Sequence, residues 1–361
     1  IASVLARTYN KMRFGSVPEN SRKTRNYEAL MRERTVRVFA FLDELIGALP
    51  VPPNHRELLQ RHLEVVRELA EARPDMSAVR FPLLVHAAVT GDEELALPAA
   101  AACTCLYVGA DLFDSLVDNE LPPSWRTRDP AEVNLAAATL LGALPQFSIA
   151  RLREQGTPPA KLWALSYLFA ETVLTMGAGQ HEDLLFPTLE NVSLEDGRAM
   201  AERKSGAEYA LYAKAGAALA TEEPSTVEAY AAFGSCFGVA KQLVNDVWGI
   251  WGEDVSRDLL NGKRTLPIVY ALSGLRGERR ERLQKLLVAS RESTEHHDEV
   301  RSLLAAAGSV RYTALIVWLY QQQARKHLAA ASPQEPAGQE FRILLDDALL
   351  PPHTEEVRPS D

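Results

Sequence analysis

The chain has 361 residues, of which 47% are hydrophobic and 24% charged, so it can bury a large core, and a disordered or fibrous protein is excluded. Its 39 lysines and arginines against 48 acids give a net charge of −9. No basic stripe runs along any segment, which argues against nucleic acid as a partner. The longest apolar runs, residues 81–89 and 135–144, are shorter than the roughly 20 residues that span a bilayer. With three cysteines that lack metal or disulfide spacing, we expect a soluble cytoplasmic protein without a membrane span.

Helical periodicity dominates the chain. Residues 1–25 are basic and polar without a clear period, and they predict an N-terminal arm. From Tyr27 onward, apolar residues recur at spacings of three and four, and alternating strand patterns are scarce. We therefore expect an all-α fold with one large helical domain over residues 26–332, because no linker divides the middle of the chain.

Proline and capping residues mark the breaks between the expected helices. Prolines at positions 50, 52 and 53, at 122 and 123, and at 187 should end or interrupt helices. Ser193 followed by Asp196 predicts an N-cap with an acid in the first turn of the next helix. The composition then becomes polar and proline-rich. Residues 333–361 are therefore expected to form a loosely held tail around one short apolar element, residues 341–350.

Three aspartates predict the first functional helix face. Asp111, Asp114 and Asp118 lie at i, i+3 and i+7, so their carboxylates share one face of a helix. No lysine or arginine accompanies them in the sequence, and their apolar neighbours make the cluster costly unless a cation neutralises it. Hard oxygen donors of this kind suit Mg²⁺ with phosphate as a co-ligand. The competing interpretation is a solvated face at the end of a helix.

A second polar stripe lies within the segment QLVNDVWGIWGED. Asn245, Gly249 and Glu253 lie at i, i+4 and i+8, and the intervening positions are mostly valine, isoleucine and tryptophan. A polar stripe among aromatic residues indicates the wall of a cavity, whereas the alternative is a surface stripe on an amphipathic helix. Asp246 lies off this stripe.

Together these segments resemble the trans-isoprenyl diphosphate synthase family, whose two aspartate-rich DDxxD helices face each other across a central cavity. The similarity covers roughly residues 75–330. The matching segments, in order, are ADLFD at 110–114, GQHEDL at 179–184, Lys204 with Ser205, QLVNDVWG at 242–249 and DLLNGKRTLPIVYAL at 258–272. The resemblance implies a helical bundle of the isoprenoid synthase type with a central cavity, and a homodimer.

The two motifs depart from the family pattern. Ala110 stands where the first aspartate of the first motif belongs, so metal binding there depends on Asp114 and its neighbours. In the second motif, Asn245, Gly249 and Glu253 match the pattern (N/D)Dxx(S/T/G)xxxE of class I terpene cyclases. Glycine offers no side-chain ligand, so water would have to take that coordination position.

The positions that grip isopentenyl diphosphate in the family have lost their cationic side chains. They are occupied by Ser77, Ala78, Val79, Phe81, Cys103, Asn119 and Glu120. A diphosphate is strongly anionic, and a glutamate in place of an arginine would repel it. Chain elongation with isopentenyl diphosphate is therefore disfavoured, while the side that binds metal and the allylic diphosphate is largely retained.

The resemblance implies roles for individual residues. The expected Mg²⁺ ligands are Asp111, Asp114, Asp118, Asn245, Gly249 and Glu253, and the expected catalytic residues at the diphosphate are Lys204, Lys263, Arg311 and Tyr312. The expected substrate-binding residues are Phe113, Gln180, Tyr209, Gln242 and Trp248. For the aromatic residues ordinary core packing is the alternative, and for the two glutamines it is hydrogen bonding to neighbouring backbone.

The leading hypothesis is a Mg²⁺-dependent class I terpene cyclase, a carbon–oxygen lyase that ionises farnesyl or geranylgeranyl diphosphate and folds the carbocation. A second hypothesis is a prenyltransferase that uses an acceptor other than isopentenyl diphosphate, such as a hydroxyl or an indole. Loss of the cationic pocket fits both hypotheses. A third is a catalytically inactive subunit that regulates an active synthase, as Ala110 and Gly249 would suggest.

Overall fold

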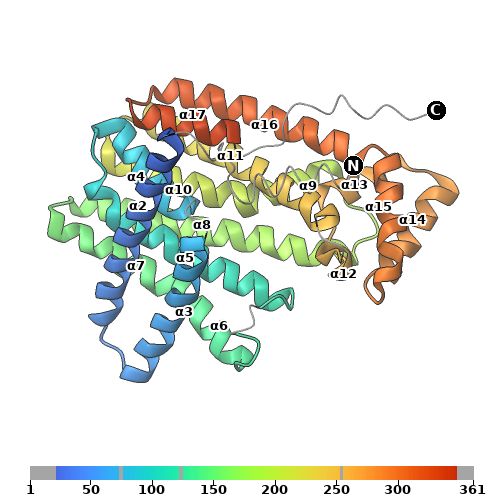
Figure 1. The fold of residues 1–361 in the computed structure, drawn as a ribbon, viewed down its shortest axis with the longest axis horizontal. Coiled ribbons are helices and arrows are strands. Elements are labelled where there is room, and N and C mark those ends of the chain that lie inside the picture. The colour runs from blue at the N-terminus through green and yellow to red at the C-terminus, as the bar shows by residue number, and fades with distance from the viewer. Residues whose placement is uncertain (1–21, 73–75, 122–124, 253–254, 348–361) are drawn as a thin grey trace.

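The computed structural model describes residues 22–72, 76–121, 125–252 and 255–347 (Figure 1). These residues form helices joined by short connections, and no strand occurs among them, which confirms the predicted all-α class. The predicted arm lies largely outside the described residues, since the first described helix begins at Arg22. The domain boundaries themselves stay a prediction.

The helices fall into two halves along the chain. The first half contains α2 (Arg22–Gly47), α3 (Pro53–Ala72), α4 (Ser77–Thr90), α5 (Leu97–Val117), α6 (Pro130–Ala138), α7 (Leu144–Ala150) and α8 (Pro159–Leu185). The second contains α9 (Leu194–Ala201), α10 (Ala207–Ala220), α11 (Pro224–Trp251), α12 (Arg257–Leu260), α13 (Leu266–Gly274), α14 (Gly277–Ala289), α15 (His297–Ala306), α16 (Ser309–Ala331) and α17 (Ala337–Asp347). Ser193 caps α9 with Asp196 in a capping box, which confirms the predicted helix start.

Small residues let the central helices approach each other closely. A Cβ atom at Gly216 of α10 would lie 2.4 Å from the carbonyl oxygen of Pro82 in α4. At Gly234 of α11 it would lie 2.3 Å from the carbonyl oxygen of Tyr209 in α10. No side chain fits at these crossings, so α4, α10 and α11 are held together at backbone contact.

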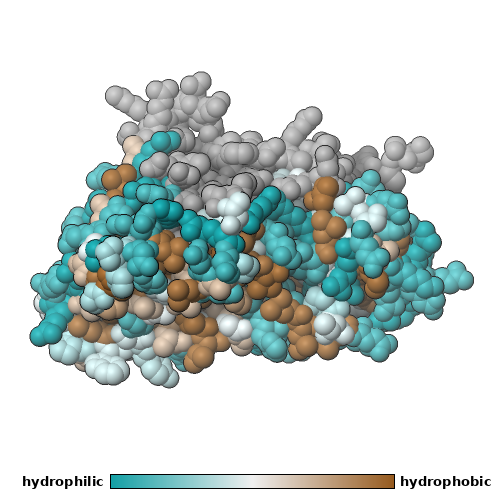
Figure 2. Space-filling model, turned by 90° about the horizontal axis from the view of Figure 1, so that it is seen from below, coloured by the Kyte–Doolittle hydropathy of each residue, from teal (hydrophilic) through white to brown (hydrophobic). Residues whose placement is uncertain are grey.

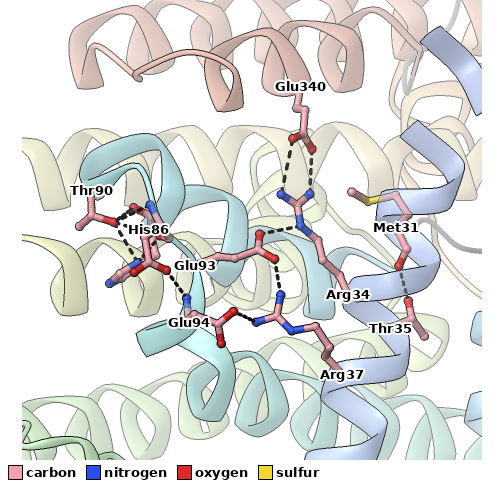
Figure 3. A network of polar contacts seen from close by, with 10 residues as sticks. Met31, Arg34, Thr35, Arg37, His86, Thr90, Glu93, Glu94 and Glu340 are labelled. Carbon is pink, nitrogen blue, oxygen red and sulfur yellow. Dashed lines mark hydrogen bonds and ion pairs between the residues drawn. The ribbon is translucent and has the colours of Figure 1, made fainter. Parts of the chain in front are cut away.

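The end of the chain packs into this core. Phe341 of α17 is buried and meets the ring of Phe233 edge-on, with centroids 5.1 Å apart. Arg34 of α2, itself buried, donates from Nε to Glu93 and from Nη1 to Glu340, each at 2.8 Å (Figure 3). The segment expected to be a loose tail therefore contains a helix that is fixed by packing and by ion pairs. The polar residues on both sides of this helix led to the prediction of a loose tail, although one face of the helix is buried.

Two helical stretches among the described residues are long and apolar enough to cross a membrane, namely Glu94–Val117 and Pro130–Gln155. These helices are longer than the uninterrupted apolar runs in the sequence, because each helix continues across isolated polar residues. Of the most apolar part of Glu94–Val117, 72% is buried inside the protein, where α5 packs against α2, α4, α6 and α7. Its apolar character is therefore explained by its place in the core. Figure 2 shows one face of the surface, on which apolar groups lie among polar ones.

Candidate active site

Two lysines and three aspartates from separate segments meet at the centre of the site. Lys204 Nζ lies 3.1 Å from Asp114 Oδ1 and 3.0 Å from Asp183 Oδ2. Lys263 forms an ion pair with Asp118, and its Nζ lies 3.7 Å from Asp183 Oδ2. We call these five residues the carboxylate–lysine cluster. Asp183 contacts both lysines and so joins the segments that carry them.

The local structure explains how Lys204 reaches the aspartates. It lies in a π-helical turn, Glu202–Gly206, of a kind that often occurs at functional sites. Gly179 of α8 allows this turn to come close, because a Cβ atom at Gly179 would lie 2.8 Å from the backbone nitrogen of Lys204. One residue further on, Gln180 Nε2 donates a 2.7 Å hydrogen bond to Asp114 Oδ1. Gln180 therefore supports the first motif and does not bind neighbouring backbone.

The charges in the cluster stabilise one another. Burial alone would raise the pKa of Asp114, but Lys204 and Lys263, with hydrogen bonds from Lys204 and Gln180, hold it below its usual range. Burial would lower the pKa of both lysines, and the neighbouring carboxylates raise it above the usual value instead. For Asp118, burial outweighs Lys263 and raises the pKa of the carboxyl group. Both lysines therefore stay protonated at neutral pH.

The second motif faces the cluster with Asp246. This residue is buried, accepts a 2.9 Å hydrogen bond from Gln242 Nε2, and lies 3.4 Å from the backbone N–H of Leu266. Burial raises the pKa of Asp246 to about 6. The hydrogen bond from Gln242 lowers this pKa, and the charge of Asp183 raises it. Asn245, which the sequence placed on the functional stripe, lies on the exposed side of α11. The carboxylate that faces inward is thus the one that lay off the predicted stripe.

Gly249 makes room for a carboxyl group that was not among the predicted site residues. A Cβ atom there would lie 2.3 Å from Asp258 Oδ2. Burial raises the pKa of Asp258 to about 8. Lys263 lowers this pKa, whereas the neighbouring carboxylates of Asp246, Asp183 and Asp118 raise it further. The space that was expected to hold water beside Gly249 is therefore occupied by Asp258.

The remaining predicted ligands and catalytic residues are more scattered. Asp111 lies exposed one turn before Asp114, and Glu253 lies outside the described residues. Arg311 is exposed on α16, while Tyr312 stacks on Tyr270 with ring centroids 4.2 Å apart. Metal binding by Asp111, Asn245 and Glu253, and diphosphate contact by Arg311 and Tyr312, stay predictions.

The predicted substrate-binding aromatics differ in their surroundings. Tyr209 packs against Phe81 and Phe237 with ring centroids 5.6 Å away in both cases, which is the core packing named as its alternative. Phe113 of α5 is partly exposed, and Trp248 of α11 is half-buried. Gln242 accepts a 2.6 Å hydrogen bond from Ser205 Oγ, so its amide joins the Lys-Ser pair to the second motif.

Three acidic residues of the site were not named as candidates. Asp183 stands in GQHEDL at i+3 from Gln180, and that shared helix face was the signal for it. Asp258 follows the second motif by a short turn, and Glu208 follows Lys204 by four residues on the same helical run. Asp183 is buried, and charged residues are rarely buried without a function or a partner.

The donor set suits Mg²⁺ in chemical terms. Asp114, Asp118, Asp183, Asp246 and Asp258 supply hard oxygen donors in the same part of the protein, and among the described residues Lys204 and Lys263 balance part of their charge. In the described ranges, no three His, Cys, Asp or Glu side chains converge as ligands of one metal ion. The reason is visible in the ion pairs, since Lys204 and Lys263 lie between the carboxylates.

Comparison with known proteins agrees with this arrangement. The sequence profile described as polyprenyl synthetase matches residues 92–306. A (2E,6E)-farnesyl diphosphate synthase of Mycobacterium tuberculosis is 28% identical, over 82% of this chain and 86% of the relative. A geranylfarnesyl diphosphate synthase of Aeropyrum pernix is 24% identical over 72% of this chain and 83% of its own. A polyprenyl synthetase structure from Streptomyces coelicolor superposes with a TM-score of 0.75 at 23% identity, covering 89% of this chain and 99% of that one.

The fold and the site define an all-helical protein of the isoprenyl synthase type. The chain belongs to the polyprenyl synthetase family. The predicted assignment as a carbon–oxygen lyase of the terpene cyclase class is wrong, because the relatives are named as farnesyl, geranylfarnesyl and geranylgeranyl diphosphate synthases. That assignment depended on the spacing of Asn245, Gly249 and Glu253, a three-residue pattern that carries less information than a match over 92–306.

Proposed function

We propose that this protein transfers the prenyl group of an allylic isoprenyl diphosphate, of farnesyl or geranylgeranyl length, to an acceptor other than isopentenyl diphosphate. The observation that carries the proposal is the packing of the region where a second diphosphate would have to bind. Ala78, Val79, Phe81 and Cys103 are all buried in the hydrophobic core. None of them can present a charge to an anion.

The aromatic surroundings of Phe81 strengthen this argument. Its ring stacks on Phe233 at 5.7 Å and meets Phe237 at 5.3 Å. A diphosphate in this place would lose its hydration, which is costly. The buried Arg80, which precedes Phe81, already donates from Nη2 to the carbonyl oxygen of Glu340 at 3.3 Å. An apolar or neutral acceptor would not carry that cost.

Glu120 is acidic at another of the positions that bind isopentenyl diphosphate in the family. It accepts hydrogen bonds from Arg257 Nη1 at 3.1 Å and from Asn261 Nδ2 at 3.2 Å. The arginine at this point is therefore already paired with a carboxylate. It offers less to a second diphosphate than an unpaired arginine would.

The carboxylate–lysine cluster supports binding of the first diphosphate. Lys204 and Lys263 are charged and held in place by aspartates, so they are suited to neutralise the leaving group. Mg²⁺ held by Asp114, Asp118 and Asp246 would act as a Lewis acid on the diphosphate oxygens. The aspartates fix the positions of both lysines before the substrate arrives, which lowers the reorganisation needed during reaction.

The deciding experiment supplies purified protein and Mg²⁺ with farnesyl or geranylgeranyl diphosphate, once with isopentenyl diphosphate and once with hydroxyl- or indole-containing acceptors. We expect a prenylated acceptor and no lengthened diphosphate. Efficient elongation with isopentenyl diphosphate would overturn the choice of acceptor. It would favour the second candidate, a chain-elongating synthase, which the names of the relatives support.

A matched pair of variants tests the part played by the cluster. Asp114→Asn removes a charge that contacts Lys204 and should slow turnover by roughly 10² or more, the scale for loss of one electrostatic stabiliser. Asp111→Asn, one turn earlier on the exposed side, should be milder. Steady-state turnover against Mg²⁺ concentration measures both. If Asp111→Asn proves the more damaging, the metal site lies one turn away from Asp114.

We also propose that two copies associate through α8. Trp163, Tyr167 and Leu174 lie on this helix at spacings that place them on one side, and their exposed fractions are 78%, 68% and 76%. Large apolar side chains so exposed on one helix are typical of an interaction surface. The expected homodimer would cover them.

A further inference from the structure

A cavity of about 440 Å³ lies between residues 189–193, which precede α9, and the helices α13 and α14. None of the five residues of the carboxylate–lysine cluster lines it. Its volume is within the roughly 300–1,000 Å³ of small-molecule sites. The apolar part of its lining consists of Leu189, Val192, Val269 and Leu272. The charged part consists of three arginines, Arg264, Arg276 and Arg280, and one carboxylate, Glu190, so positive charge is in excess. None of these residues belongs to the proposed catalytic machinery.

Arg264 is the most informative of the lining residues. It is half-buried, and burial together with the nearby Arg291 lowers its pKa. Within the part of the chain that the structure describes, no carboxylate forms an ion pair with it. A partly buried guanidinium next to a second arginine is costly unless an anion neutralises it.

Two further arginines line the same cavity with neutral partners. Arg280 donates from Nε to the carbonyl of Leu272 at 3.1 Å and from Nη2 to Asn191 Oδ1 at 2.7 Å. Arg276 Nη1 donates to the carbonyl of Leu275 at 2.9 Å. None of these three hydrogen bonds neutralises the positive charge, so both guanidinium groups can still attract an anion.

We infer that this cavity binds a diphosphate group that carries a hydrocarbon chain. Planar guanidinium groups match phosphate oxygens in a bidentate geometry, and three of them line this cavity. The four aliphatic side chains give the cavity a surface that an inorganic anion would not use. The ligand class is thus an organic diphosphate, bound at a second site.

The second site is connected to the first through one short segment. Lys263 pairs with Asp118 in the cluster, and the next residue, Arg264, lines the cavity. The two side chains leave the chain toward different sites. The inference goes beyond the proposed reaction and does not depend on it, because binding at the second site requires no turnover.

The test measures binding without a divalent cation, since the cluster then has more carboxylates than lysines and repels diphosphate. Titration calorimetry with a farnesyl thiodiphosphate, which resists ionisation, in EDTA should show one site per chain. Arg264→Gln and Arg280→Gln should each weaken binding at least tenfold. Arg279→Gln, an exposed neighbour on α14 outside the lining, is the matched control and should bind like the parent protein.

Each other result contradicts the inference. Absence of binding in EDTA, or equal weakening by Arg279→Gln, would remove the site. Inorganic diphosphate that binds as tightly as the prenyl compound would remove the role of the apolar wall. Circular dichroism melting checks that the variants fold, and Arg276→Gln, at an exposed position, replaces any variant that does not. Activity assays on the same proteins report on the proposed reaction separately.

Discussion

The carboxyl group of Glu208 lies beside the carboxylate–lysine cluster and has an unusually high pKa. It accepts a hydrogen bond from the Tyr212 hydroxyl. Burial raises its pKa from 4.5 to about 7; the Tyr212 bond opposes this shift, and Asp111 and Asp114 add to it. The folded state therefore holds a proton that the unfolded chain has already released near pH 6.

We predict that Glu208→Gln stabilises the protein in a pH-dependent way. Below pH 4.5 the carboxyl group is neutral in both states, so the parent and the variant should differ little. Stability of the parent should fall as pH rises from 4.5 to about 7 and level off above that. The variant should gain at most about 3 kcal/mol relative to the parent across this window. Urea unfolding at pH 5, 6, 7 and 8 measures it, and a difference that stayed constant with pH would mean that titration of the Glu208 carboxyl group is not its cause.

At this scale the sequence indicates the motif residues but not their contacts. The family spacing identifies Asp114, Lys204 and Lys263, and the structure brings all three together. It does not identify Asp258 as the neighbour of Gly249, because that contact depends on how the chain turns after α11. Burial, which sets the proton affinity of Asp258, is likewise a property of the whole fold.

Helix α8 allows a prediction at the scale of one element, since two of its glycines differ only in what surrounds them. A Cβ atom at Gly179 would lie 2.8 Å from the backbone of Lys204, whereas nothing lies within 4 Å at Gly177. Gly177→Ala should stabilise by about 0.5–1 kcal/mol through helix propensity. Gly179→Ala should destabilise by about 1–3 kcal/mol through overpacking.

Turnover separates the effect of crowding from that of helix propensity. Gly179→Ala must displace the π-helical turn that carries Lys204, so it should also lower turnover, while Gly177→Ala should leave it unchanged. Chemical denaturation and steady-state assays on both variants measure the two quantities. If Gly179→Ala kept full activity and stability, the close approach of α8 to that turn would be wrong.

Elements were predicted best where local rules decide the outcome. The Ser193 cap and the all-α class follow from short-range spacing, and the structure has both. The burial of α17 was not predicted, because it depends on Phe341 meeting Phe233 and on Glu340 meeting Arg34, contacts that join distant parts of the chain. Periodicity describes a helix but not the surface on which it packs.

At the scale of the whole molecule, the exposed side of α8 is the feature that the single chain leaves unexplained. Its tryptophan and tyrosine are the kind of residues that dominate the energy of interfaces. A second copy would bury both, because a twofold axis brings the same surface of each chain together. Association of two copies would thus bury the apolar side chains of α8 that stay exposed in the single folded chain.

The corresponding prediction concerns Trp163 and Tyr167. Analytical ultracentrifugation of the parent protein should give about twice the 39.8 kDa of one chain, and the double variant Trp163→Glu with Tyr167→Glu should sediment as a monomer. Val288→Glu is the control, since Val288 is an apolar residue that is 62% exposed on α14 and the substitution places a glutamate on a different helix. A parent protein that sediments as a monomer, or a double variant that stays dimeric, would place the interface elsewhere. Both substitutions lie on the exposed side of α8, away from the cluster, so we expect the variant to stay folded. Thermal melting of the variants distinguishes unfolding from dissociation.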